Sequence, residues 1–458
     1  MIRIRNKAEL VANGGTPLNR KARSLALSSL EAALNAVDPA KIVKSKLAVK
    51  NSVLQVDKYR FNLKKFKNIY VVGGGKAGAS MAKAVEQILG NRITAGIVNV
   101  PRGSRLKTRF IELHEANHPT PDEAGVKGTR RMLETAEQAE KNDLIICLIS
   151  GGGSSLMPMP RDRISIEDKK KLTDALLRSG ATINEINTVR KHISDFKGGW
   201  LAKKAYPSTI LNLILSDVVG DPLDFIASGP TVPDSTTFAD AISVLEKYRL
   251  WENTPQSIRK VLSDGRKKLI PETPKADDEA FKKTYNVVIG NNRLASTSAC
   301  QKLKSSGINP LLLTATLEGE ARHVATVLVS IAREAASSGN PVSKPAGIVA
   351  GGETTVTVEG KGKGGRNQEL ALAAAIKLEK TDGMVVASLS TDGVDGPTDA
   401  AGAIVDGQTV IRARKAQLAP EEFLAENDSY TFFSKLDDLI FTGATGTNVN
   451  DLSIAIVL

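Results

Sequence analysis

Apolar runs and helical patterns alternate along the first half of the chain. Short runs of Val, Ile and Leu predict buried strands, and apolar residues that recur at helical spacing between them predict helices. The expected strands are 69–73, 95–100, 111–116, 144–149 and 210–216, and the expected helices include 20–36, 122–140 and 167–179. This alternation predicts an α/β fold, with a doubly wound parallel sheet and helices on both of its faces.

A polar stretch that contains three prolines interrupts the alternation at 252–284 and predicts a helical connection followed by a linker. A second series of apolar runs follows it, at 286–290, 310–313, 347–351, 355–359, 384–388, 438–441 and 454–457. The runs 347–351 and 355–359 are short and close together, which favours antiparallel pairing and hence a mixed second sheet. We therefore predict two domains, one over residues 1–275 and a smaller one over residues 276–458.

The strand expected at 69–73 ends in a glycine-rich turn that carries a lysine. Gly74, Gly75 and Lys76 come directly after it, and a helical pattern begins soon afterwards. A strand that turns through glycines into a helix presents backbone N–H groups at the positive end of the helix dipole, where an anion can bind. Lys76 adds a full positive charge there. The turn predicts an anion site, although a tight turn without any ligand is the alternative.

Two familiar phosphate motifs match this turn only in part. Gly73, Gly75 and Gly78 fit the G-x-G-x-x-G fingerprint of dinucleotide-binding domains. That fingerprint also requires an acidic residue about 20 positions further on, whereas the next strand ends in Asn99. The P-loop pattern fails because alanine, and not serine or threonine, follows Lys76. Neither motif identifies the anion.

Other glycine-rich loops follow strands in the first half of the chain. Ligands in open α/β sheets bind beyond the carboxyl ends of the strands, so these loops are candidate binding sites. The loop after 144–149 offers N–H and hydroxyl groups suited to an anion or a hydroxyl group, from Ser150, Gly152, Ser154 and Ser155. Asp217 ends the next expected strand, where a carboxylate can accept a proton or hold Mg²⁺. A structural turn and a capping aspartate are the alternatives.

The second half of the chain repeats this pattern with charged residues. Glu353 follows the run 347–351, and Arg366 ends a glycine-rich segment at the start of an expected helix, where a permanently charged guanidinium can face a phosphate. Asp392 lies in a loop with two further aspartates, a composition that suits Mg²⁺. Asn448 lies in a small, polar last loop. Ordinary turns and a solvated arginine are the alternatives.

The residue types of these loops favour phosphoryl transfer. Lys76 and Arg366 are two cations on glycine-rich loops, and several carboxylates suit Mg²⁺. None of the four histidines is placed by the sequence to activate a serine nucleophile. Phosphoryl transfer needs mainly positioning and charge neutralisation, with little covalent work by the protein.

Composition narrows the range of partners. The chain has 458 residues, of which 41% are hydrophobic and 4% aromatic, which predicts two or three domains with aliphatic cores. The net charge of +12 is dispersed and aromatic residues are not interleaved with the basic runs, so we predict no nucleic-acid partner. No apolar run reaches the roughly 18 residues that a membrane span needs, and no signal-peptide segment follows the N-terminus. The two cysteines lie far apart in the chain, which is typical of unpaired thiols in a reducing compartment. We therefore predict a cytoplasmic protein.

The motifs together resemble those of the class II glycerate kinases, the family whose C-terminal part is called the MOFRL domain. The resemblance extends from about residue 20 to the end of the chain. The segments that carry it are Val72–Ala77, Ser150–Ser155, Asn187–His192, Leu215–Asp221, Gly351–Thr354, Gly365–Glu369, Ser390–Gly393 and Thr445–Asn448.

The resemblance implies ATP-dependent phosphorylation of D-glycerate at its 2-hydroxyl, with Mg²⁺ or another divalent cation. It also implies a Rossmann-like N-terminal domain, a smaller C-terminal domain, and an active site in the cleft between them. On this hypothesis Lys76 and Arg366 neutralise the transferring phosphoryl group, and Asp217 accepts the hydroxyl proton. The residues expected to bind substrate or phosphate are Gly74, Gly75, Ser150, Gly152, Ser154, Ser155 and Asn448, and those expected to hold the metal are Glu353 and Asp392.

Two other functions stay open at this point. An NAD(P)H-dependent hydroxypyruvate reductase fits the G-x-G-x-x-G match, but the missing carboxylate near Asn99 counts against it. A basic nucleic-acid-binding protein gives no reason for six polar glycine loops at strand ends. The sequence leaves open the choice between the 2- and the 3-hydroxyl, the nucleotide and metal preference, the range of hydroxy acids, and whether the protein is a monomer or a homodimer.

Overall fold

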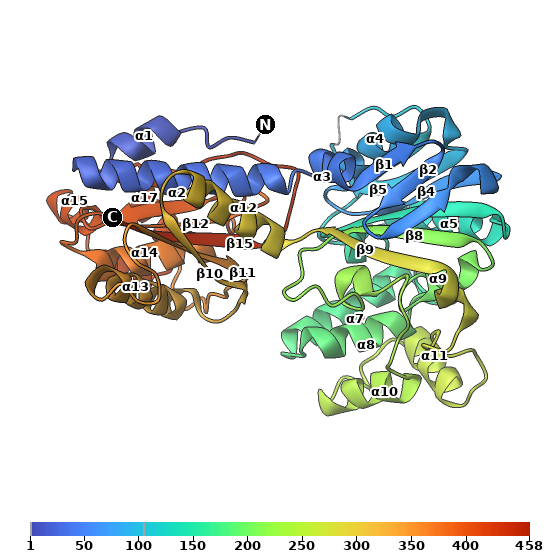
Figure 1. The fold of residues 1–458 in the computed structure, drawn as a ribbon. Helices are drawn as coiled ribbons and strands as arrows, with labels where there is room; N and C mark the ends of the chain where they lie inside the picture. The colour runs from blue at the N-terminus through green and yellow to red at the C-terminus, as the bar shows by residue number, and fades with distance from the viewer. Residues whose placement is uncertain (1, 104–105) are drawn as a thin grey trace. The chain divides into compact units, whose positions relative to one another are not determined.

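The chain folds into two units whose boundaries differ from the predicted ones. The computed structural model describes residues 2–103 and 106–458. Unit 1 comprises Met1–Asp38 and Gly290–Leu458, and unit 2 comprises Pro39–Ile289 (Figure 1). The sequence predicted one division, between residues 275 and 276. The structure instead divides the chain at two places, after Asp38 and after Ile289. The first 38 residues pack with the C-terminal half of the chain, and the polar stretch at 252–284 lies wholly within unit 2.

Unit 2 is built on a six-stranded sheet with the strand order β6-β5-β4-β7-β8-β9. The strands are β4 (Asn68–Gly74), β5 (Ala95–Pro101), β6 (Ile111–Ala116), β7 (Asp143–Ser150), β8 (Thr209–Leu215) and β9 (Thr284–Gly290). All pairs from β6 to β8 are parallel, as predicted. Counted along the chain, the order is 3-2-1-4-5-6, that of the Rossmann fold. β9 was expected in the second sheet and instead forms the edge of this one, beside β8.

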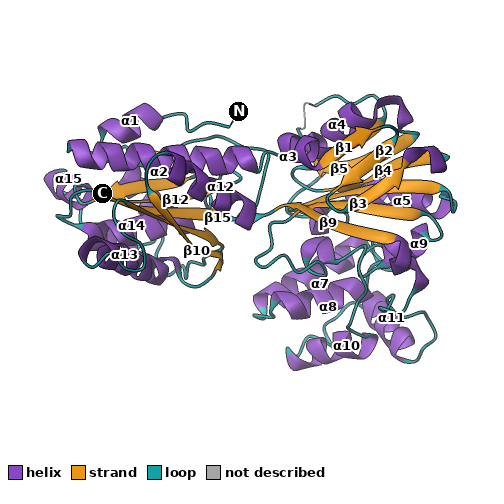
Figure 2. Ribbon diagram, in the orientation of Figure 1, coloured by secondary structure: helices purple, strands orange, loops and turns teal. Residues whose placement is uncertain are grey.

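Helices pack against this sheet because their apolar stripes face it. α3 (Pro39–Lys46) packs on α4 (Gly78–Leu89), which contacts β5 and β7, whereas α5 (Glu123–Gln138) and α9 (Trp200–Ala205) contact β5, β6 and β8 (Figure 2). A one-turn helix, α6 (Gly153–Leu156), follows β7. A separate antiparallel sheet of β1 (Leu47–Lys50), β2 (Val53–Val56) and β3 (Tyr59–Asn62) was not predicted.

Four more helices of unit 2 form a group with its own core. They are α7 (Ile166–Arg178), α8 (Ile183–His192), α10 (Phe238–Lys247) and α11 (Gln256–Arg266). Their shared core includes Leu172, Ile186 and Leu262. A buried polar contact holds α8 to the chain after α11, because His192 Nε2 lies 2.9 Å from Glu272 Oε1.

We expect Glu272→Gln to lower the free energy of unfolding at neutral pH, with a difference from wild type that shrinks in acid. Burial alone would raise the pKa of Glu272, but hydrogen bonds from His192 and from the N–H groups of Phe238 and Thr273 outweigh it and lower the pKa to about 2. The stabilisation is thus present above the ordinary carboxyl pKa of 4.5 and is lost as the pH falls toward 2. Denaturant unfolding across this pH range measures it.

The matched control for this prediction is Glu246→Gln. Glu246 is exposed on α10 in the same helical group. Its substitution should leave the free energy of unfolding close to that of wild type at every pH. Equal pH dependence in the Glu272 and Glu246 variants would contradict the role given to Glu272.

Unit 1 contains a second six-stranded sheet, with the order β10-β11-β15-β12-β13-β14. The strands are β10 (Asn309–Leu317), β11 (Ala346–Gly352), β12 (Met384–Ser390), β13 (Gly402–Asp406), β14 (Leu439–Ile440) and β15 (Asp451–Val457). β10 and β11 pair in parallel and the other pairs are antiparallel, so the sheet is mixed, as predicted.

The mixed character has a different origin from the one expected. The segment 355–359 forms no strand beside 347–351, and only Thr355 makes an isolated bridge, to Glu320. Val358 is 72% exposed, and Val356 is half-buried against the core. The antiparallel neighbour of β11 is β15, the last strand of the chain. β13 was not predicted.

Helices cover both faces of the second sheet. α2 (Pro17–Ala36) and α12 (Asn292–Ser305) pack together on one face, and α13 (Ala321–Ser337) and α14 (Arg366–Leu378) pack together on the other (Figures 1 and 2). Shorter helices complete the unit: α1 (Lys7–Ala12), α15 (Thr409–Lys415), α16 (Pro420–Ala425) and α17 (Ser429–Ser434). Within the described residues, no helix has both the length and the apolar character that crossing a bilayer requires.

Candidate active site

The first two predicted loops meet at the centre of the unit 2 sheet. β4 and β7 are neighbours there, and the strand order reverses between them, which is where open α/β sheets bind ligands. Backbone N–H of Lys76 donates to the carbonyl oxygen of Gly151 at 2.7 Å. N–H of Ala77 donates to Ser150 Oγ at 3.0 Å. The turn after β4 and the serine loop after β7 are therefore one hydrogen-bonded structure.

Two glycines permit this close approach. Gly73 and Gly75 have φ angles of 142° and 149°, which residues with a side chain rarely adopt. A Cβ atom on Gly73 would lie 2.0 Å from the carbonyl oxygen of Leu148, and one on Gly75 would lie 2.1 Å from Ser150 Oγ. A side chain at either position would force the two loops apart.

Lys76 lies half-buried over the serine loop. A Cβ atom added to Gly152 would lie 3.3 Å from Cγ of Lys76 and 2.8 Å from the ring of His118. Helix α4 begins at Gly78, two residues after Lys76, and its N-cap residue, Ala77, makes no side-chain capping bond. First-turn N–H groups without a capping side chain, beside a lysine, suit an anion.

The serines of the loop after β7 are joined to two further segments. Ser154 Oγ lies 3.0 Å from Ser228 Oγ, and Ser228 Oγ donates to Asn187 Oδ1 at 3.1 Å. Ser155 Oγ donates to the carbonyl oxygen of Gly152 at 3.0 Å. These bonds organise the loop, and α8, which carries Asn187, becomes part of its surroundings.

Lys197 is a residue of this region that the sequence interpretation missed. It is 1% exposed, and its Nζ donates to the carbonyl oxygens of Ser154 and Ala227 at 3.1 and 3.3 Å. Burial, followed by repulsion from Lys169 and Arg190, lowers the pKa of Lys197 well below its ordinary value. The buried amine of Lys197 thus ties the serine loop to the turn at Ala227, a contact that no motif indicated.

Asp217 lies at the same edge of the sheet as these loops. It is two residues beyond the end of β8, the neighbour of β7, and it is half-buried. The carboxyl ends of parallel strands share one edge. The predicted position of Asp217 beside the serine loop is thus compatible with the topology.

Asn99 argues against a dinucleotide in this unit. It is fully buried, and its Nδ2 donates to the carbonyl oxygens of Gly125 and Leu156 at 3.1 and 2.6 Å. The position where a dinucleotide-binding domain needs a ribose-binding carboxylate is taken by an amide that holds α5 against the sheet.

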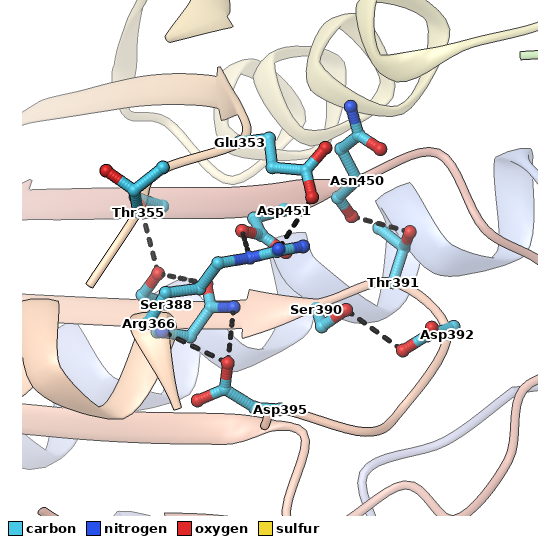
Figure 3. A network of polar contacts seen from close by, with 12 residues as sticks. Glu353, Thr355, Arg366, Ser388, Ser390, Thr391, Asp392, Asp395, Asn450 and Asp451 are labelled. Carbon is cyan, nitrogen blue, oxygen red and sulfur yellow. Dashed lines mark hydrogen bonds and ion pairs between the residues drawn. The ribbon is translucent and has the colours of Figure 1, made fainter. Parts of the chain in front are cut away.

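In unit 1 the predicted residues converge on the first residue of β15. The register of the sheet places Asp451 between Gly352 on β11 and Ser390 on β12. Glu353 and Asp392 follow these two strands, so both acidic residues belong to the edge where β15 begins (Figure 3). Three segments that are distant in the sequence thereby form one acidic group.

Arg366, the first residue of α14, is held by two of these acidic residues, Asp451 and Glu353. Its Nε and Nη2 donate to the two carboxylate oxygens of Asp451 at 2.5 and 3.1 Å, and its Nη1 donates to Glu353 Oε1 at 2.6 Å (Figure 3). Burial alone would lower the pKa of Arg366, but Asp451 and Glu353 raise it. The guanidinium is therefore charged and fixed in direction.

Asp451 is the second residue that the sequence interpretation missed. Its side chain is 8% exposed. Burial raises its pKa to about 7, although Arg366 acts in the opposite direction. The only sequence signal for it was its place at the end of the last glycine-rich loop.

The carboxylates of the loop after β12 have different tasks. Asp395 is 1% exposed and accepts from the N–H groups of Asn367 and Gln368 at 3.1 and 2.9 Å, so it caps the start of α14. Asp399 accepts from the Tyr430 hydroxyl at 2.7 Å. Asp395 and Asp399 thus have structural partners, and Asp392 stays the one aspartate of this loop predicted to hold a metal.

The remaining candidates of unit 1 lie beside Asp451. Asp392 Oδ1 accepts from Ser390 Oγ at 2.9 Å and from the N–H of Val394 at 3.0 Å. Asn448 is half-buried three residues before Asp451, and its Oδ1 accepts from the N–H of Asn450 at 3.2 Å. Both residues line the same edge of the sheet as Glu353.

The donor set fits Mg²⁺ without forming a dedicated metal cage. In the described parts of the chain, no group of three or more His, Cys, Asp or Glu side chains is arranged to hold a metal. Mg²⁺ is usually bound by one or two carboxylates and completes its shell with water and substrate phosphates. Glu353, which is 42% exposed, and Asp392 supply that type of ligand at one edge.

Comparison with known proteins agrees with both halves of the chain. Residues 25–263 match the family described as "Domain of unknown function (DUF4147)", and residues 346–451 match the MOFRL family. The "Glycerate 2-kinase" of Pyrococcus horikoshii is 44% identical over 436 residues, which cover 95% of this chain and 97% of that protein.

The chain belongs to the MOFRL family of glycerate kinases.

A solved structure supports the family's fold. The crystal structure of a glycerate kinase from Thermotoga maritima matches with a TM-score of 0.84 at 42% identity, covering 94% of this chain and 98% of that one. A relative from Agrobacterium vitis, 40% identical over 438 residues covering 95% of this chain and 94% of that protein, is provisionally named a hydroxypyruvate reductase. Names in the family thus include both of the enzyme classes considered from the sequence.

Proposed function

We propose that this protein transfers the γ-phosphoryl group of ATP to the 2-hydroxyl of D-glycerate and releases 2-phosphoglycerate and ADP. The observation that carries the proposal is the 44% identity to a glycerate 2-kinase along 95% of the chain. The residues support it, since each unit presents a cation on a glycine-rich loop with polar groups around it. Phosphoryl transfer requires this positioning and charge neutralisation.

Lys76 and Arg366 neutralise the charge of the transferring group. A guanidinium has five N–H donors, and three of those of Arg366 are used by Asp451 and Glu353, which leaves two for phosphate oxygens. The two carboxylates aim these donors, so little reorganisation is needed during transfer. Lys76 belongs to unit 2 and Arg366 to unit 1, so the proposal requires both units to act on the same substrates.

The other residues bind, orient and move a proton. Asp217 accepts the proton of the glycerate hydroxyl as that oxygen bonds to the γ-phosphorus and the bond to ADP breaks. The loop Ser150–Ser155, the backbone of Gly74 and Gly75, and Asn448 orient the substrates. Glu353 and Asp392 would hold Mg²⁺, which supplies charge neutralisation on the phosphates when bound.

A coupled assay tests the reaction and its position. The protein is incubated with ATP, Mg²⁺ and D-glycerate, and enolase alone is added to follow the absorbance of phosphoenolpyruvate. We expect product without a mutase, because enolase dehydrates 2-phosphoglycerate and not the 3-isomer. ADP formation with an enolase signal only after mutase addition would overturn the 2-hydroxyl assignment.

The hydroxypyruvate reductase alternative has its own test. It predicts loss of NADH or NADPH absorbance with hydroxypyruvate and no ATP turnover. We expect no such oxidation, because the buried Asn99 amide stands where the ribose-binding carboxylate is needed. A cytoplasmic location and a monomeric or homodimeric state stay predictions from the sequence.

A further inference from the structure

A group of three basic residues adjoins the serine loop of unit 2. It consists of Lys169, Arg190 and Lys197, whose positive charges disfavour one another. Burial, and then the charge of Arg190, lower the pKa of Lys169 to about 7. Burial, and then the charges of Lys169 and Arg190, also lower the pKa of Lys197. Lys169 is anchored by the carbonyl oxygen of Pro158, which Nζ meets at 2.7 Å, and Lys197 by the carbonyl oxygens of Ser154 and Ala227.

Arg190 is the member of this group that can reach a ligand. It is half-buried, whereas Lys169 and Lys197 are 5% and 1% exposed. It lies three residues after Asn187 on α8, so the two side chains share one face of the helix. Asn187 already faces the serine loop through Ser228 and Ser154. Arg190 therefore lies on the side of α8 that adjoins the serine loop.

Arg190 carries the permanent positive charge of this group, because burial lowers the pKa of both lysines. In the described residues, no ion pair joins Arg190 or Lys197 to an acidic side chain. Asp195, whose charge acts on Lys169, lies 3.3 Å from Arg161 Nε, and Asp234 lies 2.9 Å from Lys191 Nζ. Half-buried positive charge without a counter-ion favours binding of an anion.

The backbone beside the group is strained in a way that is typical of binding sites. Ala227, Ser228 and Gly229 have consecutive positive φ angles of 52°, 60° and 62°. Two of the three residues carry a Cβ atom, for which this region is costly. Gly198 and Gly199 donate N–H bonds to the carbonyl oxygens of Ser228 and Gly229 at 2.9 and 2.8 Å and hold the turn in place. The surrounding structure thus fixes the Ser228 hydroxyl near Asn187.

We propose that Arg190 binds the carboxylate of the hydroxy-acid substrate, on the α8 side of the serine loop. This inference rests on the proposed function, because it assigns the acid group of glycerate to a residue. Lys76 and Arg366 are assigned to the phosphoryl group, so Arg190 on α8 is left for the other anion of the reaction, the carboxylate of glycerate. A planar guanidinium fork matches a carboxylate with two parallel N–H bonds.

The test is the Arg190→Gln variant, compared with wild type in steady-state kinetics. We expect the KM for D-glycerate to rise about 10- to 100-fold, as for loss of a hydrogen bond to a charged group, with the KM for ATP within twofold of wild type. Arg190→Lys should recover part of the loss, because it keeps the charge and not the fork. Binding of D-glycerate alone, measured by titration calorimetry without ATP, should weaken in parallel.

The control is Arg178→Gln, an exposed arginine on α7 in the same unit, which should leave both KM values unchanged. An unchanged KM for D-glycerate in Arg190→Gln would overturn the proposal, as would a rise confined to the KM for ATP, which would assign Arg190 to the nucleotide phosphates. If wild-type protein does not phosphorylate D-glycerate at all, the proposed function itself fails. Circular dichroism of each variant separates these results from misfolding.

Discussion

The Arg366→Ala variant should lose about three orders of magnitude in kcat while keeping its fold. An arginine that stabilises the charge of a transferring phosphoryl group contributes a factor of this size. The side chain is held by two carboxylates, so its position is fixed before substrate binds. Its removal leaves Asp451 buried, but the pKa of that carboxyl is already raised to about 7, so it can take up a proton rather than remain as an unpaired charge. Turnover is measured with the enolase-coupled assay, and the fold by circular dichroism.

Two comparisons make this result specific. Arg293→Ala removes an exposed arginine from α12 in the same unit and should leave kcat within twofold of wild type. Arg366→Lys keeps a charge but loses the bidentate contact with Asp451, so it should remain strongly impaired. Near-normal kcat in Arg366→Ala would remove Arg366 from the catalytic assignment.

Lys76→Ala should be impaired to a similar degree, and the double variant tests whether both residues serve one step. Groups that stabilise the same transition state are strongly non-additive, so the double variant should lose far less than the product of the single losses. Lys64→Ala, an exposed lysine of unit 2, is the control. Simple multiplication of the two losses would indicate that Lys76 and Arg366 contribute independently and do not act as a unit.

The loops of unit 2 could be predicted from the sequence because parallel strands order their own ends. Once 69–73 and 144–149 are interpreted as strands of a doubly wound sheet, their following loops must lie at one edge. The contact of Lys76 with Gly151 follows from that topology. Local patterns were sufficient there because the glycines and the lysine are adjacent in the chain.

The surroundings of Arg366 could not be predicted in the same way. Its main partner, Asp451, is 85 residues away and is brought to it by the antiparallel register of β15 between β11 and β12. Register is set by packing across the whole sheet, and no local pattern encodes it. The basic group of Lys197 and Arg190 could not be predicted for a related reason, since Lys197 and the helix of Arg190 meet at the strained turn of Ala227 and Ser228, to which Lys197 and Asn187 bond.

Helix α2 shows what an amphipathic pattern can and cannot predict. The amphipathic pattern at 20–36 predicted α2 correctly, because apolar residues at helical spacing indicate a helix that packs on something. The pattern does not say which sheet receives it. α2 packs on β12 and β15 in unit 1, and its buried face carries one charged residue, Arg23, which pairs with Asp406 and Asp438.

Arg23→Met should destabilise unit 1 by about 3–5 kcal/mol, the cost of breaking a buried ion pair by removing one partner. The side chains of Arg23, Asp406 and Asp438 are all 0% exposed. Arg23 Nε donates to Asp406 Oδ2 at 2.5 Å, and its Nη1 donates to Asp438 Oδ1 at 2.7 Å and to the carbonyl oxygen of Leu10 at 2.9 Å. Without the guanidinium, Asp406 loses its ionic partner in the core, and burial already raises its pKa.

Denaturant unfolding followed by far-ultraviolet circular dichroism measures this effect, and Arg20→Met is its control. Arg20 lies one turn earlier on the same helix, and it is exposed, with a single hydrogen bond of 3.3 Å to the carbonyl oxygen of Gly15. Its substitution should change the free energy of unfolding by no more than about 0.5 kcal/mol. The two tryptophans, Trp200 and Trp251, both lie in unit 2, so their fluorescence follows that unit separately in the same samples. Equal stability of the Arg23 and Arg20 variants would mean that α2 is held by its apolar face alone, and that the buried charges only fix its register against β13.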